Sequence, residues 1–138
     1  MFVLDTNVLS EEMKPVPERT VHFWLSRQNP QDLFTTAVTE AEIIYGVTIL
    51  PDGKRKRDLD AAAQRVLALF AGRILPFDSA AAREFALIVA DRRRAGRPIE
   101  DFDAQIAAIT RSRGMSLATR DVQDFASTGV QLVDPWQP

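Results

Sequence analysis

The sequence predicts an α/β domain in which a mostly parallel sheet of about five short strands is covered by helices on both faces. Short runs of apolar and β-branched residues alternate along the chain with longer segments whose apolar residues recur at helical spacing. No internal repeat, low-complexity tract or linker interrupts this alternation. The chain has 138 residues, 46% of them hydrophobic, which is enough for one continuous core. We therefore expect a single domain over residues 1–138.

The first half of the chain is predicted to hold two strands and three helices. Hydroxyl and proline residues mark where its helices begin. Thr6 and Thr39 can each cap a helix, and Pro17 suits a helix's first turn. The expected strands are Phe2–Leu4 and Leu33–Thr35, and the expected helices are Thr6–Glu12, Pro17–Gln28 and Thr39–Leu50.

Glycines end the predicted helices of the second half, because Gly72, Gly96 and Gly114 each follow the last residue of an apolar helical pattern. Ser79 is expected to cap the middle helix, and Asp101 to begin the last one. The expected helices are Lys54–Phe70, Ser79–Gly96 and Asp101–Gly114, and the expected strands are Arg73–Phe77, Met115–Ala118 and Val130–Val133.

Composition excludes several kinds of site. The chain has no cysteine and a single histidine, His22, so thiolate chemistry and sites with several histidines are ruled out. A serine hydrolase would need His22 as its base, and no Gly-x-Ser-x-Gly turn is present. No apolar run could cross a bilayer, and the first residues lack a signal leader, so we expect a cytoplasmic protein.

The net charge of −2 is not that of a protein covered in a broad basic field. Eight of the 17 basic residues nevertheless gather in two groups, at positions 54–57 and 92–97. Both groups can be interpreted as solvated helix ends. Alternatively, they flank an acidic cleft and hold the phosphates of a polyanion.

Four acidic residues are expected at one edge of the sheet, where parallel strands end and helices begin. Asp5 ends the first strand, and Asp121 lies just beyond the fourth predicted strand. Glu42 and Asp103 lie in the first turns of helices that start near the same edge. Side chains from distant parts of the chain could therefore become neighbours.

Each acid also has a structural interpretation. Glu42 lies at capping-box spacing after a threonine, so it could satisfy a free helix amide. Asp103 is favoured early in a helix by the helix dipole, and Asp101 could be the cap beside it. Asp121 and Asp124 could cap a short turn.

Taken together, however, the acids predict a cation. Two unit charges about 4 Å apart repel by roughly 4 kcal/mol at an effective dielectric constant near 20, so clustered carboxylates need a counter-ion or a shared proton. Oxygen-only sites suit Mg²⁺ or Mn²⁺. Such an ion can activate water and stabilise the transition state of phosphoryl transfer.

The sequence resembles the PIN-domain family, and specifically the VapC/FitB-like toxins of prokaryotic toxin–antitoxin pairs. The resemblance extends over essentially the whole chain, including Phe70–Asp78 and the Pro135-Trp136 ending. Its main motifs are Asp5-Thr6-Asn7-Val8-Leu9-Ser10, Glu42-Ile43-Ile44-Tyr45-Gly46, Asp103-Ala104-Gln105-Ile106-Ala107-Ala108 and Ala118-Thr119-Arg120-Asp121-Val122-Gln123-Asp124-Phe125.

The resemblance implies a three-layer α/β/α domain, commonly a homodimer, that acts as a Mg²⁺- or Mn²⁺-dependent endoribonuclease. Asp103 is preferred to Asp101 because it precedes the Ile106-Ala107-Ala108 run by the family's spacing. The implied catalytic and metal-binding residues are Asp5, Glu42, Asp103 and Asp121, supported by Thr6 and Thr119, with Asp124 as an outer ligand or substrate-positioning group.

The resemblance also implies partners. Family members cleave RNA, with tRNA a possible target, and are silenced by a cognate antitoxin that places a basic side chain in the acidic pocket. DNA binding would belong to the antitoxin, in agreement with the absence of a broad basic field here.

Two other functions are open to this sequence. Asp5 could be the nucleophile of an aspartyl-phosphate enzyme, but the second aspartate of haloacid-dehalogenase-like phosphatases and the lysine of receiver domains are both absent. Alternatively, the acids could anchor a partner's arginines in a non-catalytic binding module. An RNA cleavage assay separates the second alternative from a nuclease.

Overall fold

One parallel sheet organises the molecule, described here from a computed structural model of residues 1–138. Its five strands lie in the order β3-β2-β1-β4-β5, and Val3 in the central strand pairs with Phe34 and Leu117 on its two sides. The strands are β1 (Phe2–Leu4), β2 (Leu33–Thr36), β3 (Ile74–Leu75), β4 (Ser116–Ala118) and β5 (Leu132–Val133). The predicted α/β class with five short strands is confirmed.

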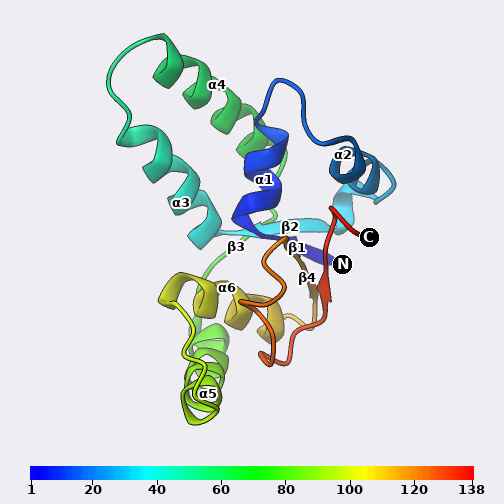
Figure 1. Cartoon of the computed structure of the whole chain (residues 1–138), viewed down its shortest axis with the longest axis vertical. Coiled ribbons are helices and arrows are strands. Elements are labelled where there is room, and N and C mark those ends of the chain that lie inside the picture. Colours follow the sequence, from blue (N-terminus) through cyan, green and yellow to red (C-terminus); the bar gives the residue numbers. More distant parts are fainter.

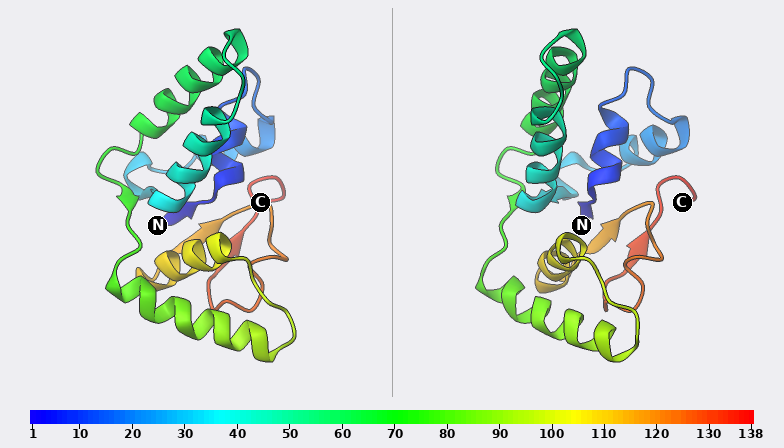
Figure 2. Two further views of the ribbon diagram at one scale, coloured as in Figure 1. Left: turned by 90° about the vertical axis from the view of Figure 1, so that its left-hand side faces the viewer. Right: turned by 60° about the vertical axis from the view of Figure 1, so that its left-hand side comes forward.

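Helices cover both faces of this sheet. Figures 1 and 2 show α1 to α4 on one side of the strands and α5 with α6 on the other. The helices are α1 (Thr6–Glu12), α2 (Arg19–Ser26), α3 (Ala37–Thr48), α4 (Lys54–Ala68), α5 (Ser79–Arg94) and α6 (Asp101–Ser112), with a 3₁₀ turn, η1, at Pro30–Asp32. None of them is long and apolar enough to span a membrane.

Side-chain alternation along the strands divides the core into two clusters. Leu4 and Ala118 pack under α1 to α4, whereas Val3 and Leu117 face α5 and α6. All four are buried. The expected three-layer α/β/α arrangement is therefore confirmed.

The central strand β1 is the point at which the chain reverses its direction across the sheet. The chain places β2 and β3 on one side of β1, and then returns to place β4 and β5 on the other side. In open parallel sheets, ligands bind beyond the carboxyl ends of the strands at such a switch point. The fold therefore indicates that a ligand would bind at the edge of the sheet beyond the carboxyl ends of β1 and β4.

The capping residues of two helices in the first half differ from the predictions. Thr6 is not the cap of α1, because the Asp5 carboxylate accepts a hydrogen bond from the Thr6 amide and Thr6 is already helical. Thr39 does not open α3 either: the Thr36 hydroxyl accepts from the Thr39 amide, 3.0 Å away. In both cases a neighbouring residue with extended backbone and a suitable oxygen takes the capping role.

The cap of α5 and the start of α2 also differ from the predictions. Asp78, not Ser79, caps α5 by accepting from the Ala81 amide. Pro17 precedes α2, which begins at Arg19. Asp101 begins α6 as predicted, but the alternative in which it caps that helix is wrong, since the cap position belongs to Glu100.

Candidate active site

Neighbouring strands bring the predicted acidic residues to one edge of the sheet, at the strands' carboxyl ends (Figure 1). Asp5 directly follows β1, and Thr119 directly follows β4, two residues before Asp121. Glu42 lies on α3, which begins where β2 ends, and Asp103 lies in the first turn of α6. The side chains thus come from both helical layers and lie near the switch point.

Asp5 is the most firmly held carboxylate of this group. Only 4% of its surface is exposed. Its Oδ1 accepts a hydrogen bond from the Thr6 amide at 2.8 Å, and its Oδ2 accepts one from the Thr119 hydroxyl, also at 2.8 Å. Both oxygens are therefore fixed by donors that belong to the ends of two adjacent strands.

Asn7 links the two strand ends, a role that sequence reasoning missed. Its Nδ2 lies 3.4 Å from Asp5 Oδ2 and 3.1 Å from Asp121 Oδ2. Its Oδ1 accepts from the Arg120 amide at 3.3 Å, and Thr119 Oγ1 accepts from the Asp121 amide at 3.0 Å. The Asn7 amide therefore holds the carboxylates of Asp5 and Asp121 near each other. An asparagine two residues after an acidic strand end was the available signal.

Glu42 is joined to the same region by a hydroxyl. Thr6 Oγ1 donates to Glu42 Oε1 at 2.8 Å and also lies 3.0 Å from Thr39 Oγ1. Because Thr36 caps α3, the interpretation of Glu42 as a capping residue is wrong. Its carboxylate instead points toward α1 and the Asp5 segment.

The surroundings of Asp5 disfavour its negative charge. The pKa of Asp5 is raised to about 6, first by burial and then by the charges of Glu42 and Asp121. The hydrogen bonds from Thr119 and Thr6 act in the opposite direction. Because the net pKa of Asp5 is raised, the loss of water and the nearby carboxylates outweigh the two hydrogen-bond donors, which lower the pKa.

Asp103 carries the largest perturbation of the site. Its pKa is raised to about 7, first by burial and then by the charges of Asp5, Asp124, Glu100 and Glu42. No hydrogen bond to the protein opposes them. Asp103 therefore lies close enough to the other acids for their charges to disfavour its ionised form, and strong pKa perturbation of this kind is typical of functional sites.

The donor set fits a hard divalent cation, because every available ligand is a carboxylate, hydroxyl or amide oxygen. The four predicted acids share one region of the surface. No three of the protein's His, Asp or Glu side chains, however, stand close enough together in this structure to form a finished metal site. What is present is a group of carboxylates whose mutual repulsion a cation would relieve.

Asp124 lies beside Asp103 rather than beside Asp5. The two line a cavity of about 160 Å³ together with Arg92, Pro98, Ile99 and Glu100. The amide of Asp124 donates to the Asp121 carbonyl at 3.0 Å, within the turn that follows β4. The turn after β4 thus carries both Asp121, near Asp5, and Asp124, near Asp103.

The two basic groups do not behave alike. Lys54 forms an exposed ion pair with Asp58 in the first turn of α4, as expected of a solvated helix end. Arg92, in contrast, is buried, with 5% of its surface exposed, so the interpretation as a solvated end is wrong for this residue.

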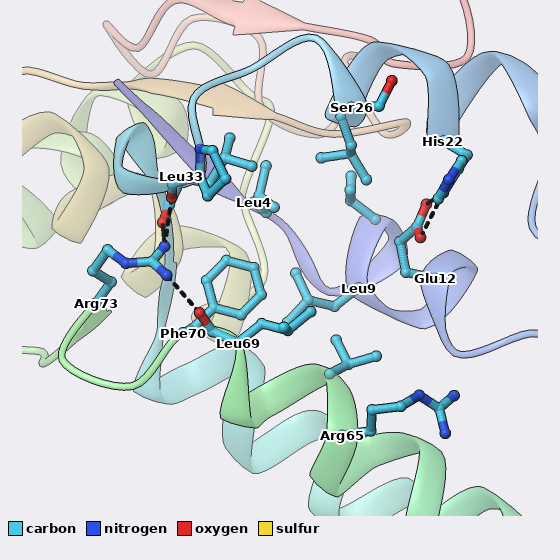
Figure 3. A pocket seen from close by; sticks show the side chains of 14 residues that line it. Leu4, Leu9, Glu12, His22, Ser26, Leu33, Arg65, Leu69, Phe70 and Arg73 are labelled. Atoms are coloured by element: carbon cyan, nitrogen blue, oxygen red, sulfur yellow. Dashed lines mark hydrogen bonds and ion pairs between the residues drawn. The ribbon is translucent and has the colours of Figure 1, made fainter.

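A separate concavity, the apolar groove, has a volume of about 490 Å³ and lies between α1, α2 and α4 (Figure 3). Arg73 closes one end by donating to backbone carbonyls, and the Glu12–His22 pair stands at the other. None of the predicted acids lines it. Its apolar lining includes Leu4, Val8, Leu9, Leu25, Val66, Leu69 and Phe70.

Comparison with known proteins identifies clear relatives. The PIN-domain profile matches residues 2–130. The chain is 39% identical to VapC ribonuclease Y4jK of Sinorhizobium fredii, with 100% of this chain and 99% of the relative covered. It is also 39% identical to Toxin FitB of Neisseria gonorrhoeae, with 99% of both covered. A tRNA(fMet)-specific endonuclease VapC of Shigella flexneri is 31% identical over 98% of this chain and 97% of the relative.

Solved structures agree with these relatives. FitAcB from Neisseria gonorrhoeae superposes with a TM-score of 0.92 at 38% identity and covers 100% of both chains. FitAB bound to an IR36 DNA fragment gives a TM-score of 0.92 at 40% identity, covering 100% of this chain and 97% of that one.

Proposed function

Because the chain belongs to the PIN-domain family and to its VapC/FitB-like toxins, we propose that it is a Mg²⁺- or Mn²⁺-dependent endoribonuclease, the toxin of a type II toxin–antitoxin pair. The proposal rests on Asp5, Glu42, Asp103 and Asp121 lying near one edge of the sheet, where burial and mutual repulsion raise the pKa values of Asp5 and Asp103. The ribonuclease and endonuclease names of full-length relatives support the reaction class.

Asp5 and Asp103 would hold the divalent cation, with Glu42 and Asp121 completing the set of oxygen ligands. The ion would supply positive charge for in-line attack on an RNA phosphodiester and lower the pKa of the attacking water. Asp5 is already oriented by donors from both strand ends. Glu42, whose carboxylate accepts a hydrogen bond from the Thr6 hydroxyl, would accept a proton from the attacking water.

The test is metal-dependent cleavage of structured RNA, including tRNA, by the parent and by Asp5→Asn and Asp103→Asn. Each variant removes one charged ligand, so we expect cleavage to fall by about 100-fold or more at saturating Mn²⁺. Asp101→Asn is the matched control: Asp101 is exposed, two residues from Asp103 on the same helix, and is expected to retain activity.

Equal cleavage by the parent and both variants would assign the activity to a contaminant. A parent that leaves every RNA intact would favour a non-catalytic binding module. Stable phosphorylation of Asp5 by an acyl-phosphate donor would instead indicate aspartyl-phosphate chemistry.

The proposed partner is a cognate antitoxin, and the apolar groove is where we expect one of its segments to dock. The groove presents apolar side chains to solvent, among them Leu69, which is 66% exposed. An amphipathic helix is the form of peptide that fills such a groove between helices. A basic side chain of the same antitoxin could then neutralise the acidic site, and any DNA contact would be made by the antitoxin.

Leu69→Glu should abolish co-purification with the antitoxin while RNA cleavage by the isolated protein is retained, because Leu69 lines the groove and not the acidic site. Leu87→Glu on α5 is the matched control, since Leu87 is 53% exposed and lies on the opposite helical layer. Antitoxin binding by Leu69→Glu at the parent's level would exclude the groove as the docking site.

A further inference from the structure

Arg92 is a buried cation that the proposed reaction does not use. It lies on the last turn of α5 with 5% of its surface exposed. It takes part in none of the ion pairs of the molecule. Burying a charge is costly unless hydrogen bonds compensate it. The contacts of this guanidinium must therefore supply that compensation.

Those contacts are all backbone carbonyls from two different segments. Arg92 Nε donates to the Arg97 carbonyl at 2.6 Å. Its Nη1 donates to the carbonyls of Asp124 and Ala126, each at 2.9 Å. Arg97 lies in the connection between α5 and α6, and Asp124 and Ala126 belong to the turn after β4. One side chain thus ties together the segments that carry Asp103 and Asp121.

Arg92 also borders the acidic site, because it lines the cavity of about 160 Å³ whose other lining residues include Glu100, Asp103 and Asp124. Its hydrogen bonds to the carbonyls of Arg97, Asp124 and Ala126 hold two of the segments that line this cavity.

We propose that Arg92 is a positioning residue of the acidic site: by holding both segments through their carbonyls, it sets the separation of Asp103 from Asp121 and Asp124. Arginine suits this task because its planar fork offers several donors in fixed directions, whereas the single ammonium of lysine cannot reach carbonyls on both sides. Only one consequence of this inference, the tight binding of the metal, depends on the proposed function.

Two variants and one control test the proposal. Arg92→Met removes the donors, Arg92→Lys keeps the charge but not the fork, and Arg93→Met is the matched control because Arg93 is the exposed neighbour on the same helix. Mn²⁺ affinity is measured by calorimetry, and kcat and KM are measured on the RNA that the parent cleaves. Loss of a residue that orients metal ligands typically weakens affinity by about 10- to 100-fold. We expect that loss in both Arg92 variants, a lower kcat with little change in KM, and parental behaviour in Arg93→Met.

Amide hydrogen exchange in the metal-free protein is a test that does not depend on the nuclease proposal. Exchange should accelerate by about tenfold or more in residues 122–126 and 98–103 of Arg92→Lys, with the α3 and α4 core unchanged. If Arg92→Met does not fold, Arg92→Lys decides the matter. Parental Mn²⁺ affinity or parental exchange in Arg92→Lys overturns the positioning role. If the parent protein does not bind Mn²⁺, the proposed function is overturned. The hydrogen-exchange result then tests the positioning role of Arg92 on its own.

Discussion

At the scale of single residues, the site is defined by carboxylates that resist ionisation. Asp5 and Asp103 have pKa values raised to about 6 and about 7, first by burial and then by neighbouring acids. A proton or a cation is therefore bound favourably at each of them. Near neutral pH the two compete for the same oxygens, so metal binding should release protons and strengthen as pH rises.

The raised pKa values predict how the stability of the metal-free protein depends on pH. The folded state holds these protons more tightly than the unfolded state, in which the ordinary value is 3.8. The stabilisation is therefore complete below about pH 4 and is lost as pH rises through about 6 for Asp5 and about 7 for Asp103. Urea unfolding in chelator between pH 5 and pH 8 should show parental stability declining more steeply than that of Asp103→Asn. Identical pH slopes for parent and variant would refute this assignment.

At the scale of elements, the order of strands and helices could be predicted because apolar periodicity reports which face of each segment is buried. The helix ends at Gly96 and Gly114 could also be predicted, since both residues adopt the left-handed backbone that favours glycine, with φ of 71° and 65°. The first residues of the helices were harder to predict from the sequence. Asp78 and Ser79 can both cap a helix, and only the backbone conformation of each decides between them.

The α5 cap provides a direct test of that choice. Asp78→Ala removes the acceptor of the Ala81 amide and should lower the free energy of unfolding by about 1 kcal/mol. Asp78→Asn retains an acceptor and should lose little, and Ser79→Ala should leave stability unchanged because its side chain makes no capping bond. Urea denaturation measures all three. A larger loss for Ser79→Ala than for Asp78→Ala would contradict the structure at this position.

At the scale of the whole molecule, the acids could be predicted as a group, but their supports could not. Asp5 and Asp121 follow strands, and parallel strands deliver their ends to one edge. The position of Asn7 after an acidic strand end gave only a weak signal and Arg92 gave none, because each also bonds to a segment more than 30 residues away. Their roles depend on how the turn after β4 meets α1 and α5, which only the assembled fold determines.

The acidic site also joins the two halves of the core. Asp5 follows β1 and Glu42 lies on α3, whereas Asp103 lies in the first turn of α6, which packs on the other face of the sheet. The carboxylates repel one another, and no three of them lie close enough together to form a metal site. A divalent cation at the switch point would therefore connect the layers as well as activate water.

The most direct measurement is the anomalous difference map of a crystal equilibrated with Mn²⁺ at pH 8. We predict one strong peak at the carboxyl ends of β1 and β4, with oxygens of Asp5 and Asp103 about 2 Å from the ion. The peak should be absent from crystals of Asp103→Asn. Manganese that binds only elsewhere, or a map without any peak at these acids, would contradict the assignment of this cluster as the metal centre.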